Sequence, residues 1–260
     1  MSVAVDQVEG VARLATILSA AQRILIFSGA GISTASGIPD YRGPKGVWNT
    51  RRPVFYDEFM SSHASRVEYW RQKAEDREAF RAARPNAVHE AVVALERAAR
   101  LELLVTQNVD GLHRIAGTTE EKLVEIHGTN GLVECQTCSA RTDPSGPFEA
   151  FVADGEPPVC ACGGFLKPAT ISFGQALRME DLTRSCEAAN RSDAALALGS
   201  TLLVTPAADI PLEAARSGSC YAIVNRGPTE HDDSPFVTLR IDGDVGAIFP
   251  EAVAQALAGV

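Results

Sequence analysis

The sequence has no hydrophobic run long enough to cross a membrane, since no stretch approaches the roughly 18 apolar residues that such a helix needs. It also lacks a secretion signal: Asp6 and Glu9 interrupt the apolar residues at the N-terminus, and no basic residue precedes them. These two absences predict a cytoplasmic protein that does not bind membranes.

An excess of positive charge is also missing. The 260 residues include 24 Lys and Arg against 33 Asp and Glu, which gives a net charge of −9 at pH 7. Sequence-independent binding of DNA or RNA requires basic residues that neutralise phosphates, so this composition argues against a nucleic-acid partner. An acidic surface instead attracts basic partners, such as lysine-bearing protein segments.

Cysteines are few, and their spacing does not indicate a disulfide framework. Four of the six form two close pairs, Cys135-Gln136-Thr137-Cys138 and Cys160-Ala161-Cys162. Two such pairs predict one tetrahedral structural zinc site, although the second pair is one residue shorter than usual. Gly163 and Gly164 follow that pair and provide the backbone freedom to bring both sulfurs in. The alternatives are a redox-active pair and cysteines without a ligand.

Short apolar segments of strand length alternate with amphipathic segments along most of the chain. The predicted strands are residues 23–27, 101–105, 122–126, 168–175, 194–198, 220–224 and 237–241. The predicted helices are residues 8–20, 65–83, 88–95, 179–189 and 245–258. This alternation predicts an α/β fold around a parallel sheet.

A glycine-rich segment follows the first predicted strand. Gly29 and Gly31 let the backbone turn sharply and approach a ligand, and residues 33–36 are small or hydroxyl residues that can open a helix facing a phosphate. The spacing differs from the usual dinucleotide fingerprint, and no acidic residue follows about 20 positions later. A purely structural turn therefore stays open as an alternative. Residues 37–42 favour function, because they add a carboxylate, a phenol and a guanidinium beside this turn.

Polar residues follow three of the predicted strands at their carboxyl ends. Residues 107–110 follow the second strand, His127 follows the third, and residues 199–201 follow the strand at 194–198. Ligands of open α/β sheets gather at this edge, so these side chains are predicted to lie together. His127 taken alone fits a structural histidine, but its predicted position beside the other polar strand ends favours a functional histidine.

In these motifs the sequence resembles the sirtuins, a family of NAD-dependent protein deacylases. The resemblance rests on residues 29–33, 37–42 and 106–113, and then on His127-Gly128, the cysteine pairs, Phe173-Gly174, residues 199–201 and Val224-Asn225, in the family's order. Tyr41, residues 69–71 and Pro85-Asn86 are most similar to the class II group. The sequence departs from the family pattern in three ways: Gln175 replaces a glutamate, Ser200 and Thr201 replace Thr-Ser, and the second cysteine pair is shortened.

The resemblance implies a Rossmann-like parallel sheet with an inserted zinc-binding small domain. The larger domain would comprise residues 1–128 and 168–260, with a helical insertion at about 45–85, and the small domain residues 129–167. NAD and an acyl-lysine protein or peptide would meet in the cleft between the domains.

The resemblance also assigns site residues by their motifs. The catalytic residues would be His127 as general base, with Asn108 and Asp110. The residues that bind NAD would be Gly29, Ala30, Gly31, Ser33, Ile38, Asp40, Tyr41, Arg42, Gln107, Asn108, Val109, Asp110, Gly199, Ser200, Thr201, Asn225 and Val245. The substrate would contact Ile171, Phe173, Gly174 and Val204, and structural zinc would bind Cys135, Cys138, Cys160 and Cys162.

The implied activity is NAD-dependent protein-lysine deacylation, which releases nicotinamide and O-acyl-ADP-ribose. The alternatives are transfer of ADP-ribose to a protein, an NAD dehydrogenase, and a zinc-ribbon binding module without catalysis. The acid-acyl group of the family carries a Tyr-x-x-Arg pair, which residues 69–72 do not match, so acetyl or longer neutral acyl groups are expected. The sequence does not indicate an oligomeric state.

Overall fold

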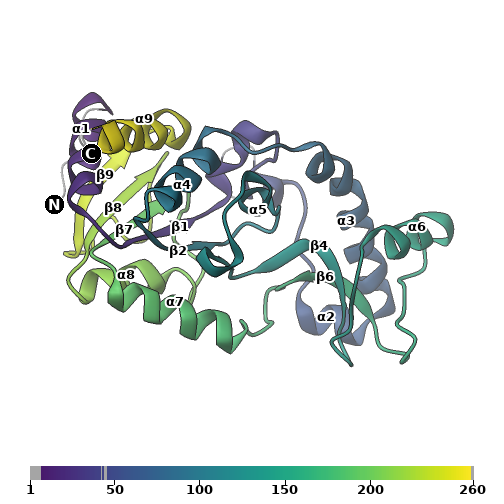
Figure 1. Cartoon of the computed structure of the whole chain (residues 1–260). Coiled ribbons are helices and arrows are strands. Elements are labelled where there is room, and N and C mark those ends of the chain that lie inside the picture. Colours follow the sequence, from purple (N-terminus) through teal and green to yellow (C-terminus); the bar gives the residue numbers. More distant parts are fainter. Residues whose placement is uncertain (1–6, 42, 44–45, 259–260) are drawn as a thin grey trace.

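The computed structural model describes residues 7–41, 43 and 46–258. Figure 1 shows a larger part built around one sheet and a smaller part beside it, which carries β4, β6, α2, α3 and α6. Arg42, one of the predicted NAD-binding residues, lies outside the described residues.

The larger part contains a parallel sheet of six strands in the order β3-β2-β1-β7-β8-β9. The strands are β1 (Ile24–Ser28), β2 (Leu101–Thr106), β3 (Leu123–Glu125), β7 (Ala194–Leu198), β8 (Cys220–Asn225) and β9 (Val237–Asp242). The strand order reverses between β1 and β7, where a parallel sheet opens a crevice for a ligand. The predicted α/β fold with a Rossmann-like sheet is confirmed.

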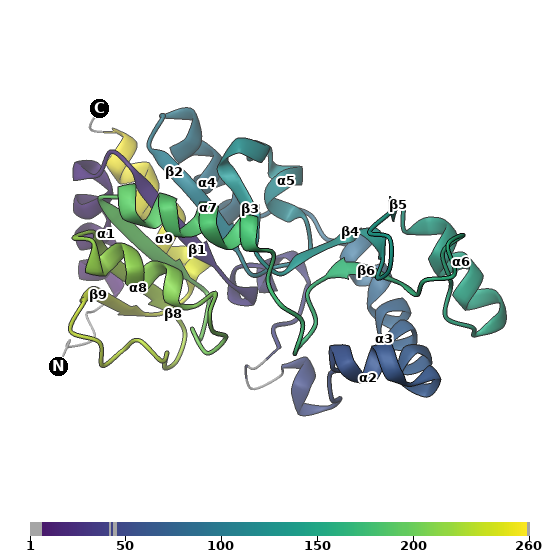
Figure 2. The same cartoon turned by 90° about the horizontal axis from the view of Figure 1, so that it is seen from below.

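Helices cover both faces of this sheet because its strands are buried on both sides. Ile24 and Ile26 pack with α1 (Gln7–Ala20), α4 (Ala87–Arg97) and α9 (Val245–Ala258). Leu25 and Phe27, the alternate residues of β1, pack with α7 (Met179–Arg191) and α8 (Asp209–Arg216). Figure 2 shows α7 and α8 in front of the sheet, with the smaller part beyond its β3 side.

The smaller part contains an antiparallel sheet in the order β5-β4-β6. Its elements are β4 (Gly128–Cys135), β5 (Arg141–Thr142), β6 (Leu166–Thr170), α6 (Ser145–Asp154), α2 (Tyr56–Ser61) and α3 (His63–Ala82). Trp70 of α3 is fully buried, packs edge-on against Phe148 at 4.9 Å and donates its indole N–H to the Leu166 carbonyl at 3.0 Å. The helices of the 45–85 segment therefore share a hydrophobic cluster with the cysteine-bearing segment. The predicted domain boundaries stay a prediction.

Two local predictions are wrong. Residues 33–36 do not open an α-helix: short 3₁₀ turns at Ala30–Ile32 and Thr34–Ser36 follow β1, and Gly37 ends them at a φ of +87°. The strand predicted at residues 168–175 ends at Thr170, because Ser172–Gln175 forms a turn in which the Gln175 amide donates to the Ser172 carbonyl. Gly174, with a φ of +80°, supplies the backbone conformation that this turn requires.

Candidate active site

A cavity of about 620 Å³ lies at the carboxyl ends of β1, β2 and β7 and extends to the smaller part. Most of the predicted site residues line it, namely Gly29, Ala30, Gly31, Asp40, Tyr41, Gln107, Asn108, Val109, His127, Ile171, Phe173, Gly174, Gly199, Ser200, Thr201, Val204 and Asn225. Four others do not line this cavity: Ser33, Ile38, Asp110 and Val245. The three predicted polar strand ends therefore meet at one edge of the sheet.

The glycine turn after β1 packs directly against the turn after β7. The Gly31 amide donates to the Gly199 carbonyl at 2.9 Å. A Cβ on Gly29 would lie 2.7 Å from the Gly199 oxygen, and one on Gly31 would lie 2.8 Å from the Gly199 Cα. Gly29 itself has an extended backbone, with a φ of −128°. These glycines are therefore required by the contact between two turns, and the same contact leaves a bare backbone wall on the cavity.

Gln107 and Asn108 connect the carboxyl end of β2 to both glycine turns. The Gln107 side chain donates to the Ser200 hydroxyl at 2.8 Å. The Asn108 side-chain amide donates to the Gly29 carbonyl at 3.2 Å and to the Ser33 hydroxyl at 3.1 Å. Because a buried polar network is rigid when its members are paired, Asn108 is held in one orientation beside the cavity.

Asp110 lies behind this wall and acts there as an anchor. Its carboxylate accepts from the Ser33 hydroxyl at 2.8 Å and from the Leu112 amide at 2.9 Å, at the start of α5 (Leu112–Ala116). Burial raises the pKa of this carboxyl group, and the two hydrogen bonds oppose that rise. Ser33 therefore lies between Asn108 and Asp110, which explains why it has no place on the cavity wall.

His127 lies between the two sheets, after β3 and directly before β4. Its Nδ1 lies 3.2 Å from the Gln107 carbonyl oxygen. A carbonyl oxygen only accepts, so Nδ1 carries the proton and the lone pair of the neutral ring belongs to Nε2. The ring lines the cavity, so this geometry suits a general base.

Aromatic side chains form the cavity wall on the side of the smaller part. The Phe173 ring lies 5.1 Å from Trp48 and 5.6 Å from Phe55, and its carbonyl accepts from the Tyr56 amide at 2.9 Å. The Gln175 side-chain oxygen accepts from the Ser172 amide at 3.1 Å. An amide and a carboxylate both offer that oxygen, so the departure from the family's glutamate leaves the turn intact.

The sequence reasoning missed the contribution of α3 to the cavity. Tyr69, Lys73 and Asp76 line it together with Arg51, which pairs with Asp76. Tyr69, Lys73 and Asp76 are spaced three or four residues apart, so they share one face of α3, and this spacing is the signal in the sequence. Tyr41 also lines the cavity, and burial first, with the charges of Asp76 and Asp110, raises the pKa of its phenol to about 12.

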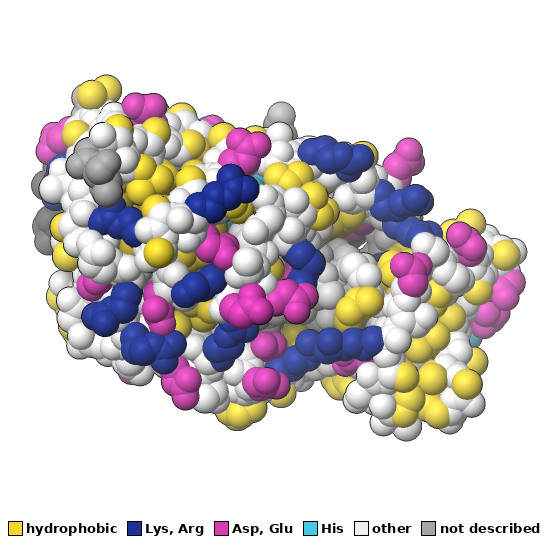
Figure 3. Space-filling view, viewed as in Figure 1, with side chains coloured by type: hydrophobic (Ala, Val, Ile, Leu, Met, Phe, Trp, Pro, Cys, Tyr) yellow, Lys and Arg dark blue, Asp and Glu magenta, His cyan; other side chains and the backbone are white. Residues whose placement is uncertain are grey.

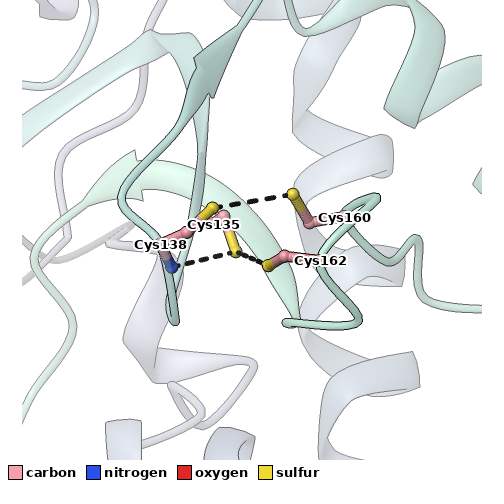
Figure 4. A group of neighbouring side chains, drawn as sticks. All are labelled: Cys135, Cys138, Cys160 and Cys162. Carbon is pink, nitrogen blue, oxygen red and sulfur yellow. Dashed lines mark hydrogen bonds between the residues drawn. The ribbon is translucent and has the colours of Figure 1, made fainter.

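The four paired cysteines converge, as Figure 4 shows, with the two pairs facing each other from separate loops. Their sulfurs all lie within 4.8 Å of one another, with Cys135 to Cys162 at 3.6 Å and Cys138 to Cys160 at 3.8 Å. Tetrahedral zinc with Zn–S bonds of about 2.3 Å requires sulfurs about 3.8 Å apart. The donor set and its spacing are therefore compatible with structural zinc.

The shortened pair reaches this geometry through the glycines that follow it. Gly163 has a φ of +84°, and a Cβ on Gly164 would lie 2.6 Å from the Cys135 sulfur. The amides of Thr137 and Cys138 donate to that sulfur at 3.4 and 3.5 Å, and they lower the pKa of Cys135 to about 6. Thiolate is the form that binds zinc.

Charges of both signs are mixed on the surface. On the face shown in Figure 3, Lys and Arg side chains are interspersed with Asp and Glu and do not form a single basic patch. Within the described part of the chain, no helix is long and apolar enough to cross a membrane.

Comparisons with known proteins identify the family. Residues 29–206 match the model of the Sir2 family. The chain is 39% identical over 240 residues to NAD-dependent protein deacetylase 1 of Bradyrhizobium diazoefficiens, covering 92% of this chain and 94% of that protein. It is 36% identical over 255 residues to an NAD-dependent protein deacetylase of Haloarcula marismortui, covering 96% of each.

Solved structures show the same relationship. A Sir2 structure with a p53 peptide and NAD+ superposes with a TM-score of 0.84 at 30% identity, covering 95% of this chain and 98% of the other. Sir2Tm bound to a propionylated peptide gives a TM-score of 0.82 at 31% identity, covering 94% and 97%. With its sheet, cavity and cysteine cluster, the chain belongs to the Sir2 family, the sirtuins.

Proposed function

We propose that the protein is an NAD-dependent protein-lysine deacylase that releases nicotinamide and O-acyl-ADP-ribose. The observation that carries this proposal is the position of His127, which lines one cavity together with the bare glycine wall and the Phe173 wall. One side of that cavity suits a dinucleotide, the other suits a peptide, and a base lies between them. The relatives named above are NAD-dependent protein deacetylases, and related structures hold peptides and NAD+.

The glycine turns suit the pyrophosphate of NAD, because Gly29, Gly31 and Gly199, which carry no side chains, line the cavity at the carboxyl ends of β1 and β7. In this proposal residues 29–31 hold the pyrophosphate, and Gly199, Ser200, Asn225 and Val245 hold the adenosine. Asp40, Tyr41 and Thr201, which line the cavity, would complete the NAD site, and Ser33 and Ile38, which do not line it, would support it. The assignment of Arg42 to this site stays a prediction. NAD supplies the ribose carbon that the acyl oxygen attacks as nicotinamide leaves.

The residues after β2 orient the reacting groups. The backbone of Val109, with Gln107 and Asn108, would grip the nicotinamide amide and order the ribose, because Asn108 is already fixed by Gly29 and Ser33. Asp110 would support this grip from behind the wall, through its hydrogen bond with Ser33. His127 would accept a proton from a ribose hydroxyl through Nε2, while its Nδ1–H continues to donate to the Gln107 carbonyl. The peptide would add as a strand between Ile171–Gly174 and Val204, with Phe173 beside the acyl-lysine chain.

Release of nicotinamide from NAD tests this proposal, with and without acyl-lysine peptides. We expect release that depends on the peptide and falls by roughly 100-fold or more in His127→Ala, because removal of a general base costs on that order. His63→Ala is the matched control, since His63 is exposed and pairs with Glu156 outside the cavity.

Other outcomes would contradict the proposal. Release without a peptide would favour ADP-ribosyl transfer or NAD hydrolysis, and ADP-ribose attached to protein would separate these two. Reduced cofactor without released nicotinamide would indicate a dehydrogenase. No release with any acyl chain, from folded protein that contains zinc, would leave only a binding module.

Several finer assignments belong to the same proposal. Cys135, Cys138, Cys160 and Cys162 would hold a zinc ion that stabilises the fold and takes no part in the chemistry. Acetyl or longer neutral acyl groups are the proposed substrates, with a panel of acyl peptides as the test. The class II assignment, the cytoplasmic location, the two-domain boundaries and the absence of nucleic-acid and membrane partners stay predictions.

A further inference from the structure

Lys167 lies in the interior of the smaller part, where a lysine is uncommon. Its side chain has no exposed surface, and its neighbours on β6, Leu166 and Pro168, are apolar. Its ammonium group donates to three oxygens of the chain that follows it: the carbonyls of Pro168 (3.4 Å) and Thr170, and the Ser172 hydroxyl (3.3 Å). Lys167 therefore binds the end of its own strand and the first residues beyond it.

Tyr69 of α3 holds the same segment from the other side. Its hydroxyl lies 3.1 Å from the Thr170 hydroxyl, and the Lys167 ammonium lies 5.5 Å from its ring centre. Burial raises the pKa of this phenol, but the charges of Lys167 and Lys73 and the hydrogen bonds with Thr170 and Ser172 together lower it to about 8. The ionisation of Tyr69 therefore depends on the charge of Lys167. Burial of these two polar side chains costs free energy that burial of apolar side chains would not cost.

The segment that they hold serves both sides of the proposed reaction. The Ile171 amide donates to the His127 carbonyl at 2.7 Å, and Gly128 lets the strands come close, since a Cβ there would lie 2.1 Å from the Ala169 oxygen. Ile171 and Phe173 line the cavity where the peptide would bind. A shift of residues 170–172 would therefore move the peptide wall and the backbone of the base together.

We infer that Lys167, together with Tyr69, is a positioning residue that holds residues 170–172 as a preformed docking edge for the acyl-lysine peptide. Neither side chain needs to touch the reacting atoms. Both fix the backbone that the peptide pairs with, so that binding does not have to order this edge. The peptide-binding part of this inference rests on the proposed deacylase function, whereas the rigidity of the edge does not.

Two measurements test the inference on the full-length, zinc-containing protein. The first is amide hydrogen exchange over residues 170–175 without ligands, and the second is steady-state kinetics with separate titrations of NAD and an acetyl-lysine peptide. In Lys167→Met we expect faster exchange over residues 170–175 and unchanged exchange over β7. The peptide KM should rise roughly tenfold or more, as expected for loss of charged hydrogen bonds, while the KM for NAD stays within about twofold.

Three further variants make the test specific. Ser172→Ala removes one acceptor with little change of volume, so it should raise the peptide KM by a smaller factor and serves if Lys167→Met does not fold. Tyr69→Phe removes only the hydroxyl at Thr170 and should act in the same direction. Lys122→Met is the matched control, because Lys122 also donates to a carbonyl, that of Glu102 at 3.2 Å, and lies outside the cavity.

The outcomes separate this inference from the proposed function. If Lys167→Met shows faster exchange over residues 170–175 but the wild type shows no peptide-dependent reaction, the positioning role is supported and the deacylase function is rejected. Wild-type turnover of peptide, with exchange and peptide KM unchanged in both Lys167→Met and Ser172→Ala, would overturn the inference. A fall in kcat alone, or an equal rise in both KM values, would also overturn it.

Discussion

The six-stranded sheet and the cysteine-bearing part of the molecule differ in what holds them together. The sheet is buried on both faces, with strands such as β1 and β7 that have no exposed residue. The smaller part has a three-stranded sheet, one compact aromatic cluster around Trp70, and the four cysteines. A small core stabilises little by apolar burial alone, so metal binding becomes a major part of its stability.

The two parts also form different walls of the cavity. The sheet presents a rigid backbone wall made of turns that contact each other, and the smaller part presents the wall on which residues 170–175 lie. The dinucleotide side of the cavity should therefore tolerate loss of metal, whereas the peptide side should not.

Removal of zinc should have the largest effect and should be confined to the smaller part. Binding of a structural zinc is worth on the order of 10 kcal/mol, so chelation or Cys135→Ala should unfold β4 to β6. The measurement is zinc content per chain together with hydrogen exchange over residues 128–170 and over β7. Cys220→Ala is the control, since Cys220 is exposed and lies outside the cluster. An equal loss of protection from hydrogen exchange in both sheets would show that the metal does not stabilise the smaller part selectively.

A methyl group at Gly199 should damage the dinucleotide wall. Its Cβ would lie 2.7 Å from the Ile32 amide nitrogen, and its φ of +61° disfavours a side chain as well. We expect Gly199→Ala to cost about 3 kcal/mol of unfolding free energy and to weaken ADP-ribose binding, because strain and overpacking add. Urea unfolding and calorimetry measure the two effects.

Gly218→Ala separates the two causes of that loss. Gly218 also has a left-handed backbone, with a φ of +103°, but a Cβ there would meet nothing within 4 Å. It should therefore cost only about 1 kcal/mol and leave ADP-ribose binding unchanged. An equal loss in both variants would show that the contact between the glycine turns contributes nothing.

Acid should destabilise the larger part through His89, by a smaller amount. This histidine is buried on α4, its ring lies 4.7 Å from that of His113, and burial lowers its pKa to about 4 from the ordinary 6.5. The unfolded chain then binds more protons below pH 6.5, so stability is lost as pH falls from 6.5 towards 4. At pH 4.5 the loss should be about 2 kcal/mol relative to pH 7.

Urea unfolding at the two pH values measures this loss, and His89→Gln should reduce it. His63→Gln should leave the pH dependence as it is, because His63 is exposed on the smaller part. If His89→Gln keeps the full pH dependence, the buried histidine is not its cause.

Much of the fold followed from local pattern. The strand predicted at 194–198 has these same bounds in the structure, and the helix predicted at 88–95 lies within α4. The prediction failed at residues 171–175, where an apolar run resembles a strand but a turn forms.

The sequence by itself determined the alternation of buried strands and helices, the polar strand ends and the pairing of the thiols, because each depends on neighbours a few residues apart. Only the tertiary structure decided that Gly31 packs against Gly199, that Asp110 pairs with Ser33, and that Lys167 is buried and donates to Thr170 and Ser172. These depend on distances between segments far apart in the chain. Hydrophobic periodicity reports which face is buried, but it does not report what that face meets.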